Sequence, residues 1–105
     1  MTENEYNQHA DAALSAIECV LESHCDDLDF DSPGAGILEI SFDDGSRIII
    51  NKQSAVQELW VAARSGGYHF RWMDGSWRDT RTGVELMATL TDLVREQSGG
   101  CCEVS

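Results

Sequence analysis

The sequence predicts an α+β domain in which two terminal helices pack on one face of a mainly antiparallel sheet of five or six strands. Apolar residues recur at helical intervals near both ends of the chain, and between these ends they alternate with polar residues. The turns between the alternating runs are short, as they are between antiparallel neighbours. Two amphipathic helices can then cover one face of the sheet and leave the other open to solvent.

The first helix is predicted over residues 3–24. Thr2 and Glu5 have the spacing of a capping box, which satisfies backbone N–H groups at a helix start. The apolar residues that follow share one helical face: Tyr6, Ala10, Ala13, Leu14, Ile17 and Leu21. The second helix is predicted to begin at another capping box, Thr82 and Glu85, and to end before Gly99.

The strands are predicted from alternation between these helices. A short strand surrounds Phe30, and residues 32–36, Ser-Pro-Gly-Ala-Gly, are interpreted as a turn. A hairpin joins 38–42 to 47–51 through Asp44-Gly45. Further strands are expected near 58–61, near 68–72 and around Trp77. The alternation predicts these residues on the open face: Glu39, Ser41, Ile49, Asn51, Glu58, Trp60, His69 and Arg71.

Residues 1–105 are predicted to form a single domain, of which residues 99–105 are a flexible tail. No run of about 18 apolar residues is present to span a bilayer, and the first residues lack the basic charge of a signal peptide. We therefore expect a cytoplasmic protein. There the four cysteines, which are Cys19, Cys25, Cys101 and Cys102, should be reduced thiols, without the spacing of a zinc site.

Charge is the outstanding compositional feature, with 19 acidic residues against 7 Lys and Arg and a formal net charge of -12. Residues 1–46 contain no Lys or Arg at all, so the negative charge is concentrated in the N-terminal part of the chain. Such a field repels nucleic-acid phosphates and anionic lipid, and it attracts cations and basic protein surfaces. We expect neither nucleic acid nor membrane as a partner.

Seven carboxylates of this part define what we call the acidic edge. On a helix Asp11, Glu18 and Glu22 fall within about 40° of one another, and strand carboxylates extend this row. Crowded carboxylates favour a cationic counter-charge, and hard cations accept several oxygen ligands. Without an EF-hand loop, binding should be shallow, weak and multi-site, and a simply solvated acidic face is the alternative. The acidic edge comprises Asp11, Glu18, Glu22, Asp26, Asp27, Asp29 and Asp31.

Catalytic motifs are missing from the sequence. There is no phosphate-binding glycine loop, no nucleophile elbow and no metalloprotease helix, and His9, His24 and His69 are scattered. We therefore expect that the protein is not an enzyme. Trp60 is predicted on the solvent side of its strand, where a large aromatic is either a binding hot spot or a ring covered by a neighbouring side chain.

These residues together resemble the bacterial frataxin homologues of the CyaY family, over a stretch from Glu5 to about Gln97. The resemblance includes the acidic first helix and the Gly36–Ser46 hairpin. Its most specific parts are Ile-Ile-Ile-Asn-Lys-Gln at 48–53 with Leu-Trp at 59–60, and Gly-Gly-Tyr-His-Phe at 66–70. The sequence departs from the family at two positions, with Ala55 where proline is frequent and Glu58 where glutamine is frequent.

The resemblance implies both helices on one sheet face and a role in iron-sulfur cluster assembly. It implies weak binding of iron, as Fe2+ or Fe3+, along the acidic edge, whereas carboxylate chemistry alone would equally allow manganese, calcium or magnesium. It further implies a regulator or adaptor that contacts the cysteine desulfurase and the scaffold protein, with Asn51, Gln53 and Trp60 on the exposed sheet surface. We expect the metal-free protein to be a monomer, and oligomerisation driven by metal is compatible with the sequence.

Two other functions are compatible with an acidic domain. An iron storage or detoxification protein would need oligomers and ferroxidase carboxylates, and the helices lack the Glu-x-x-His pairs of ferritin-like centres. An acidic mimic of nucleic acid would need negative charge over the whole molecule. Here residues 47–105 contain seven acidic and seven basic side chains, which argues against such a mimic.

Overall fold

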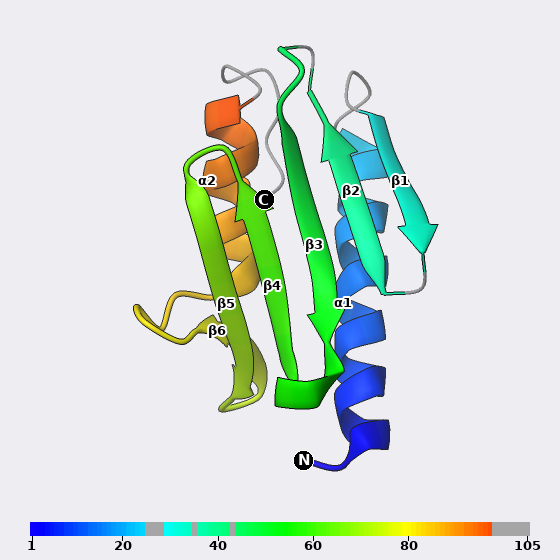
Figure 1. Cartoon of the computed structure of the whole chain (residues 1–105), viewed down its shortest axis with the longest axis vertical. Helices are drawn as coiled ribbons and strands as arrows, with labels where there is room; N and C mark the ends of the chain where they lie inside the picture. Colours follow the sequence, from blue (N-terminus) through cyan, green and yellow to red (C-terminus); the bar gives the residue numbers. More distant parts are fainter. Residues whose placement is uncertain (25–28, 35, 43, 98–105) are drawn as a thin grey trace.

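The computed structural model describes residues 1–24, 29–34, 36–42 and 44–97. It contains two helices and a six-stranded antiparallel sheet whose spatial order follows the chain, which confirms the predicted fold class (Figure 1). The elements are α1 (Glu3–His24), β1 (Asp29–Gly34), β2 (Ile37–Ser41), β3 (Arg47–Gln53), the 3-10 turn η1 (Ser54–Val56), β4 (Glu58–Ala63), β5 (Gly66–Met73), β6 (Ser76–Asp79) and α2 (Leu86–Gln97).

Helix α1 has the predicted bounds and the predicted start. The backbone N–H of Glu5 donates to the Thr2 hydroxyl at 3.1 Å, and the N–H of Thr2 donates back to the Glu5 carboxylate at 3.0 Å. These bonds hold the pKa of Glu5 below its usual value of 4.5, because they favour the ionised carboxylate. The reciprocal bonds satisfy donors that a helix start leaves free.

Both helices pack on one face of the sheet and the core lies between the two layers (Figure 1). Leu38, Ile40, Ile48 and Ile50 alternate with more exposed neighbours along β2 and β3, as a sheet with one covered face requires. The largest fully buried side chains are Tyr6, Phe70, Ile17, Leu21, Leu38, Ile40, Ile48, Ile50, Leu59, Leu90, Val61 and Val94. Within the described ranges, neither helix has the length and apolarity to span a membrane.

Helix α2 begins later than predicted, at Leu86, because the chain ahead of it is held in another conformation. Gly83 has a φ of +77°, outside the helical region, and Glu85 forms a bridge with Arg78 at the edge of β6. The carboxylate of buried Asp79 instead accepts from the backbone N–H of Arg81 at 2.7 Å. The Thr82 hydroxyl accepts from the N–H of Val84 and does not cap a helix there.

Strand β1 continues to Gly34, through a segment that we had interpreted as a turn. Its pairing with β2 shifts register between Asp31 and Gly34, and the Ser32 hydroxyl donates to the Ile37 carbonyl at 2.8 Å. A proline, which has no backbone N–H, is compatible with position 33 because β1 is an edge strand and pairs with a neighbouring strand on one side only. The Asp44-Gly45 turn forms as predicted, with Gly45 at a φ of +85°. The predicted strand residues Asp27 and Leu28 lie outside the described residues.

Candidate functional site: the open sheet face and the acidic edge

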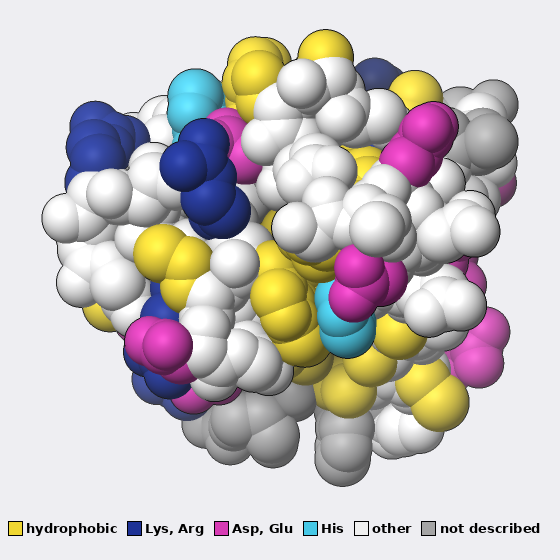
Figure 2. All heavy atoms as spheres, turned by 90° about the horizontal axis from the view of Figure 1, so that it is seen from below, with side chains coloured by type: hydrophobic (Ala, Val, Ile, Leu, Met, Phe, Trp, Pro, Cys, Tyr) yellow, Lys and Arg dark blue, Asp and Glu magenta, His cyan; other side chains and the backbone are white. Residues whose placement is uncertain are grey.

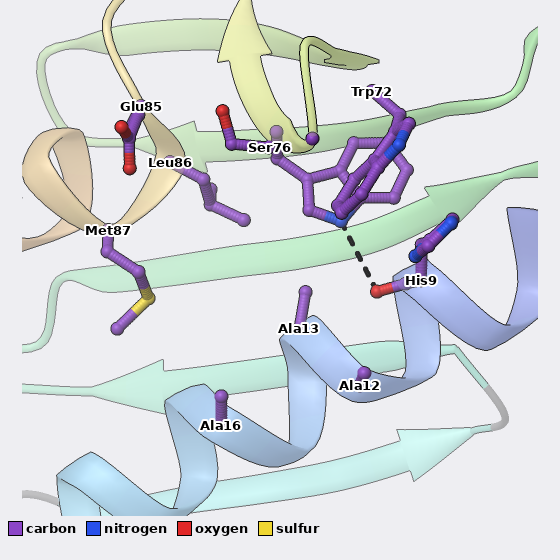
Figure 3. A pocket seen from close by; sticks show the side chains of 11 residues that line it. His9, Ala12, Ala13, Ala16, Trp72, Ser76, Glu85, Leu86 and Met87 are labelled. Carbon is purple, nitrogen blue, oxygen red and sulfur yellow. Dashed lines mark hydrogen bonds between the residues drawn. The ribbon is translucent and has the colours of Figure 1, made fainter.

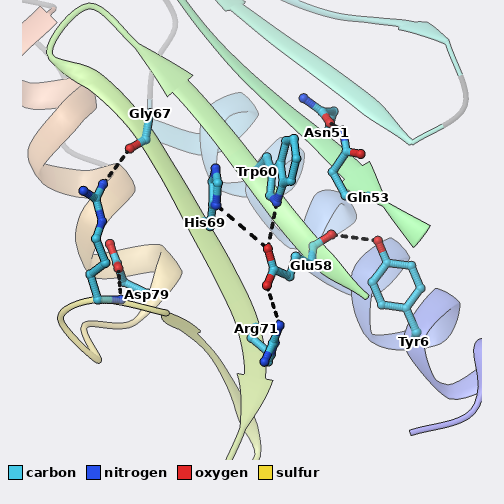
Figure 4. A network of polar contacts seen from close by, with 10 residues as sticks. Tyr6, Asn51, Gln53, Glu58, Trp60, Gly67, His69, Arg71 and Asp79 are labelled. Atoms are coloured by element: carbon cyan, nitrogen blue, oxygen red, sulfur yellow. Dashed lines mark hydrogen bonds and ion pairs between the residues drawn. The ribbon is translucent and has the colours of Figure 1, made fainter. Parts of the chain in front are cut away.

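The open face of the sheet carries two cross-strand rows of polar and aromatic side chains at its centre. Asn51, Trp60 and His69 are register partners across β3, β4 and β5. Next to them, Gln53 pairs with Glu58 and Glu58 pairs with Arg71. Because register partners point to the same side, these six side chains form one surface opposite the helices. We call it the tryptophan face (Figure 4).

Glu58 organises the tryptophan face, although its position on an open face suggested an exposed side chain. Its side chain is only 9% exposed, because neighbours from β4 and β5 lie over it. The carboxylate accepts from Trp60 Nε1 at 2.9 Å and from Arg71 at 2.8 Å, and His69 Nδ1 lies 4.0 Å away (Figure 4). The charged group is therefore paired and hydrogen-bonded, as burial demands.

Trp60 is half-buried and fixed in orientation. Its ring stacks on the His69 imidazole, with centroids 4.5 Å apart and an interplanar angle of 11°. The Glu58 carboxylate accepts a hydrogen bond from the indole N–H at the edge of the ring. A ring that is already ordered loses little conformational freedom when a partner covers it. Trp60 is thus partly covered by a neighbouring side chain, and the rest of its ring is open to solvent.

Asn51 and Gln53 lie on the same face and are half-buried. The Gln53 side-chain amide donates to the Asn51 side-chain carbonyl, which orients both amides at the end of β3 (Figure 4). Each amide keeps further donors and acceptors for a partner. The structure therefore brings together all three predicted contact residues of the sheet.

Tyr6 connects the tryptophan face to α1. Its hydroxyl donates to the backbone carbonyl of Glu58 at 2.8 Å from the opposite side of the sheet (Figure 4). Burial raises the pKa of the Tyr6 hydroxyl above its usual value of 10.0. Since this hydroxyl stays protonated and hydrogen-bonded, it fixes the start of β4 and with it the Glu58 side chain.

The described members of the acidic edge come from two elements. Glu18 and Glu22 lie near the end of α1, and Glu22 is exposed. Asp29 and Asp31 are exposed on β1, where they pair in register with Ser41 and Glu39 and so belong to the open side of the sheet. Figure 1 shows β1 and the end of α1 on the same side of the molecule. Asp26 and Asp27 lie outside the described residues.

Asp11 differs from the other described members of the acidic edge because a lysine forms an ion pair with it. Lys52 Nζ lies 3.0 Å from the Asp11 carboxylate, and the lysine side chain is 17% exposed. The same ammonium lies 5.8 Å from the centre of the Tyr6 ring. Lys52 is distant in sequence, on β3, so residues 1–46, which contain no Lys or Arg, gave no sign of this pair.

The acidic edge does not close around a metal within the described part of the chain. No group of three or more His, Cys, Asp and Glu residues there is arranged to hold an ion. The carboxylates of Glu22, Asp29 and Asp31 are exposed to solvent, and carboxylate oxygens are ligands that hard cations accept. Cys19 is a free, exposed thiol, and the other three cysteines lie outside the described residues.

Positive charge gathers at the opposite end of the sheet. Arg71 and Arg78 are cross-strand partners on β5 and β6, and the Lys and Arg side chains visible in Figure 2 lie mostly on that side. The protein therefore presents a negative edge at β1 and a mixed, partly basic surface at β5 and β6. An approaching basic surface will be oriented by this asymmetry.

Three residues of the tryptophan face were missing from the sites predicted from sequence. Glu58, His69 and Arg71 were expected on the open face, without a role. The sequence did contain a signal: Glu58 stands two positions before Trp60, and the neighbouring strand carries His69 and Arg71 at the same spacing. Such spacing brings the four side chains together across the two strands.

The protein is thus a six-stranded antiparallel sheet that two helices cover on one face and that carries an ordered tryptophan on the other. The frataxin-like domain matches residues 1–100, and the chain belongs to this family. The chain is 50% identical over 99 residues to the iron-sulfur cluster assembly protein CyaY of Dechloromonas aromatica, covering 94% of both chains. It is 44% identical to the protein of that name from Paraburkholderia phymatum, covering 100% of this chain and 99% of the relative.

Solved structures agree with this assignment. The frataxin of Psychromonas ingrahamii superposes with a TM-score of 0.90 at 28% identity, over 100% of this chain and 99% of the other. Trimeric frataxin of the yeast Saccharomyces cerevisiae, complexed with ferrous iron, superposes with a TM-score of 0.68 at 26% identity, over 94% of this chain and 88% of the yeast chain.

Proposed function

We propose that the protein is an iron-binding regulator or adaptor of iron-sulfur cluster assembly, that it acts in the cytoplasm, and that it contacts the cysteine desulfurase and scaffold complex. The observation that carries this proposal is the ordered tryptophan face. Trp60, Asn51 and Gln53 lie together on a solvent-facing sheet surface, and Glu58 fixes the indole. The names of the CyaY relatives supply the pathway.

The tryptophan face supplies the short-range contact. A large ring with one polar atom is the kind of side chain that carries binding energy at the centre of an interface. Because stacking on His69 and the bond to Glu58 order the ring beforehand, little entropy is lost on docking. The amides of Asn51 and Gln53 add directional hydrogen bonds beside it.

The acidic edge supplies the long-range attraction. Its carboxylates include half-buried Glu18 and exposed Glu22, Asp29 and Asp31, in a protein of net charge -12. Such a field raises the rate at which a basic surface of the partner is encountered and orients it. Asp11 contributes least to this attraction, since its carboxylate is already paired with the Lys52 ammonium.

Iron is cargo in this proposal. Carboxylates that are open to water exchange an ion quickly, which suits a protein that carries iron or senses it and does not use it for chemistry. The same carboxylates serve the cation and the basic partner, so bound iron lowers the negative charge that the partner meets. The apo protein is a monomer in this account, and sedimentation with and without ferrous iron distinguishes it from an oligomeric store.

Binding kinetics with the desulfurase test the two surfaces separately. Trp60→Ala should raise the dissociation rate, with a loss on the order of 2 kcal/mol, while leaving the protein folded. Replacing Glu18 and Glu22 by glutamine should slow association and flatten its dependence on salt. Val84→Ala, which truncates a side chain 45% exposed and outside both surfaces, is the matched control. Unaltered dissociation of Trp60→Ala would remove the tryptophan face from the interface.

The dependence of the melting temperature on added cations tests whether the acidic edge binds metal. Salt or millimolar divalent cation should raise the melting temperature, because screening or binding relieves repulsion among the carboxylates. Amide replacement of Glu18, Glu22, Asp29 and Asp31 should stabilise the apo protein and abolish the increment from metal. If melting in dilute buffer does not respond to ferrous or other divalent cations, the acidic edge is not a metal site.

A further inference from the structure

A cavity of about 300 Å³ lies on the helix side of the sheet, remote from the tryptophan face. Residues of α1, of the β5–β6 hairpin and of the start of α2 line it (Figure 3). Figure 2, viewed toward this end of the molecule, shows hydrophobic side chains exposed in a hollow near its centre. The family assignment and the proposed partner surface leave this cavity without a role.

The cavity exists because α1 presents small side chains where the opposite wall is bulky. Ala12, Ala13 and Ala16 face Leu86 and Met87 across it (Figure 3). Protein interiors are normally filled to the density of organic crystals, and alanine leaves space that a longer residue would occupy. The walls are apolar, and the space equals that of about ten water molecules in the liquid.

One wall of the cavity is a fixed aromatic surface. The His9 imidazole stacks on Trp72 with centroids 3.8 Å apart and an interplanar angle of 12°. Trp77 Nε1 donates to the His9 carbonyl at 3.3 Å, and the rings of Trp72 and Trp77 meet edge to face at 5.6 Å (Figure 3). Three rings from α1, β5 and β6 thus hold each other, and the cavity is formed before any ligand arrives.

Two polar groups lie on one side of the cavity and would orient a bound ligand. Ser76 lines the cavity, and its buried hydroxyl oxygen has no hydrogen-bond partner among the described residues, a costly arrangement that rotation of the hydroxyl toward a bound polar group would relieve. The Glu85 carboxylate stands at the rim with its side chain 56% exposed, and its contact with Arg78 is loose at 3.7 Å. Both groups lie on the same side of the cavity in Figure 3.

We propose that this cavity binds a small amphipathic organic cation, with its aromatic or branched aliphatic body between the alanines and Trp72 and its ammonium toward Ser76 and Glu85. The apolar walls supply affinity for the body. The rim carboxylate and the net charge of -12 favour a positive head over a negative one. A ligand of about ten non-hydrogen atoms matches the volume, and such a ligand binds with a dissociation constant of about 0.1 to 1 mM.

Three probes with the same body and different heads test the proposal: phenethylamine, 2-phenylethanol and 3-phenylpropanoate. Each is titrated into the isotope-labelled protein and followed by NMR. Phenethylamine should bind most tightly, about two- to fivefold better than the neutral alcohol, with the carboxylate weakest. The shifts should be largest for the Trp72 and Trp77 indole N–H groups and the Ala16 methyl, while the Trp60 indole should stay unchanged.

Substitutions then distinguish binding in the cavity from nonspecific adsorption to the protein surface. Ala16→Met fills the cavity from an exposed helix position and should weaken phenethylamine binding at least tenfold. Ser15→Met, at the adjacent exposed position that does not line the cavity, should leave it unchanged. Glu85→Gln should remove most of the preference for the amine over the alcohol.

Each variant is first checked for an unchanged melting profile. Absent shifts around Trp72, equal binding of all three probes, or undiminished binding by Ala16→Met would each overturn the proposal. Since the cavity lies on the helix side, these outcomes leave the proposed role of the tryptophan face untouched.

Discussion

Replacing Glu58 by alanine should destabilise the protein by about 2 kcal/mol. The substitution removes the acceptor of Trp60 Nε1 at 2.9 Å and of Arg71 at 2.8 Å, while the backbone carbonyl that Tyr6 contacts remains. A neutral hydrogen bond contributes about 1 kcal/mol and a charge-assisted one about 1.5 to 3 kcal/mol. The second figure is reduced here, because the Arg71 side chain is 55% exposed and water replaces its lost partner.

Denaturant unfolding measures the loss, and the melting temperature should fall by roughly 8 °C. A double-mutant cycle with Glu58→Gln and Arg71→Gln should give a coupling of about 1 kcal/mol. The NMR signal of the Trp60 indole N–H should move and exchange faster with water in Glu58→Ala. Glu39→Ala is the matched control, since Glu39 pairs with Arg47 at 3.1 Å on the same face but is more exposed, and it should cost about 0.5 kcal/mol.

The reasoning about Glu58 would be refuted by a Glu58→Ala protein as stable as the Glu39→Ala control. That result would mean that the carboxylate is not the group that orders Trp60. The preorganised face would then rest on the His69 stack alone.

Three further predictions concern α1 and its contacts. Tyr6→Phe should lower the free energy of unfolding, measured with denaturant, by about 1 kcal/mol. Because burial raises the pKa of Tyr6, the stabilisation by its protonated hydroxyl is complete below pH 10.0 and is lost as pH rises through the folded pKa. The variant should lack this alkaline loss of stability. Glu5, whose pKa is lowered by its bonds to Thr2, stabilises the fold above pH 4.5 and loses this effect as pH falls through the folded pKa; an NMR titration of Thr2→Ala should show the Glu5 pKa rising toward 4.5. Lys52→Gln frees the Asp11 carboxylate and should enlarge the rise in melting temperature produced by divalent metal, whereas an unchanged rise would exclude Asp11 from the acidic edge.

Much of the fold could be predicted because it is encoded locally. Thr2, Glu5 and the apolar period fix α1 from Glu3 to His24, and Asp44-Gly45 fixes the central hairpin. The sheet pattern also placed Trp60 and its neighbours on the open face. The late start of α2 could not be predicted in this way, because Asp79 and the bridge of Arg78 with Glu85 compete with the capping box.

The candidate site was less predictable, since its contacts join distant residues. Burial of Glu58 depends on Arg71 and His69 on the next strand, and neutralisation of Asp11 depends on Lys52 from β3. Neither pairing leaves a local pattern. The cavity beside Trp72 likewise needs four separate elements, α1, β5, β6 and α2, so alanines on α1 could not indicate it without the fold.

NMR mapping of the isotope-labelled protein with the cysteine desulfurase tests the central claim most directly. The account predicts that signals of Asn51, Gln53 and the Trp60 indole shift or broaden at low desulfurase concentration, together with those of Glu22, Asp29 and Asp31. Signals of Trp72, Ala16 and Met87 around the cavity should stay in place. Perturbation confined to the helix side, with the Trp60 indole unchanged, would contradict the account.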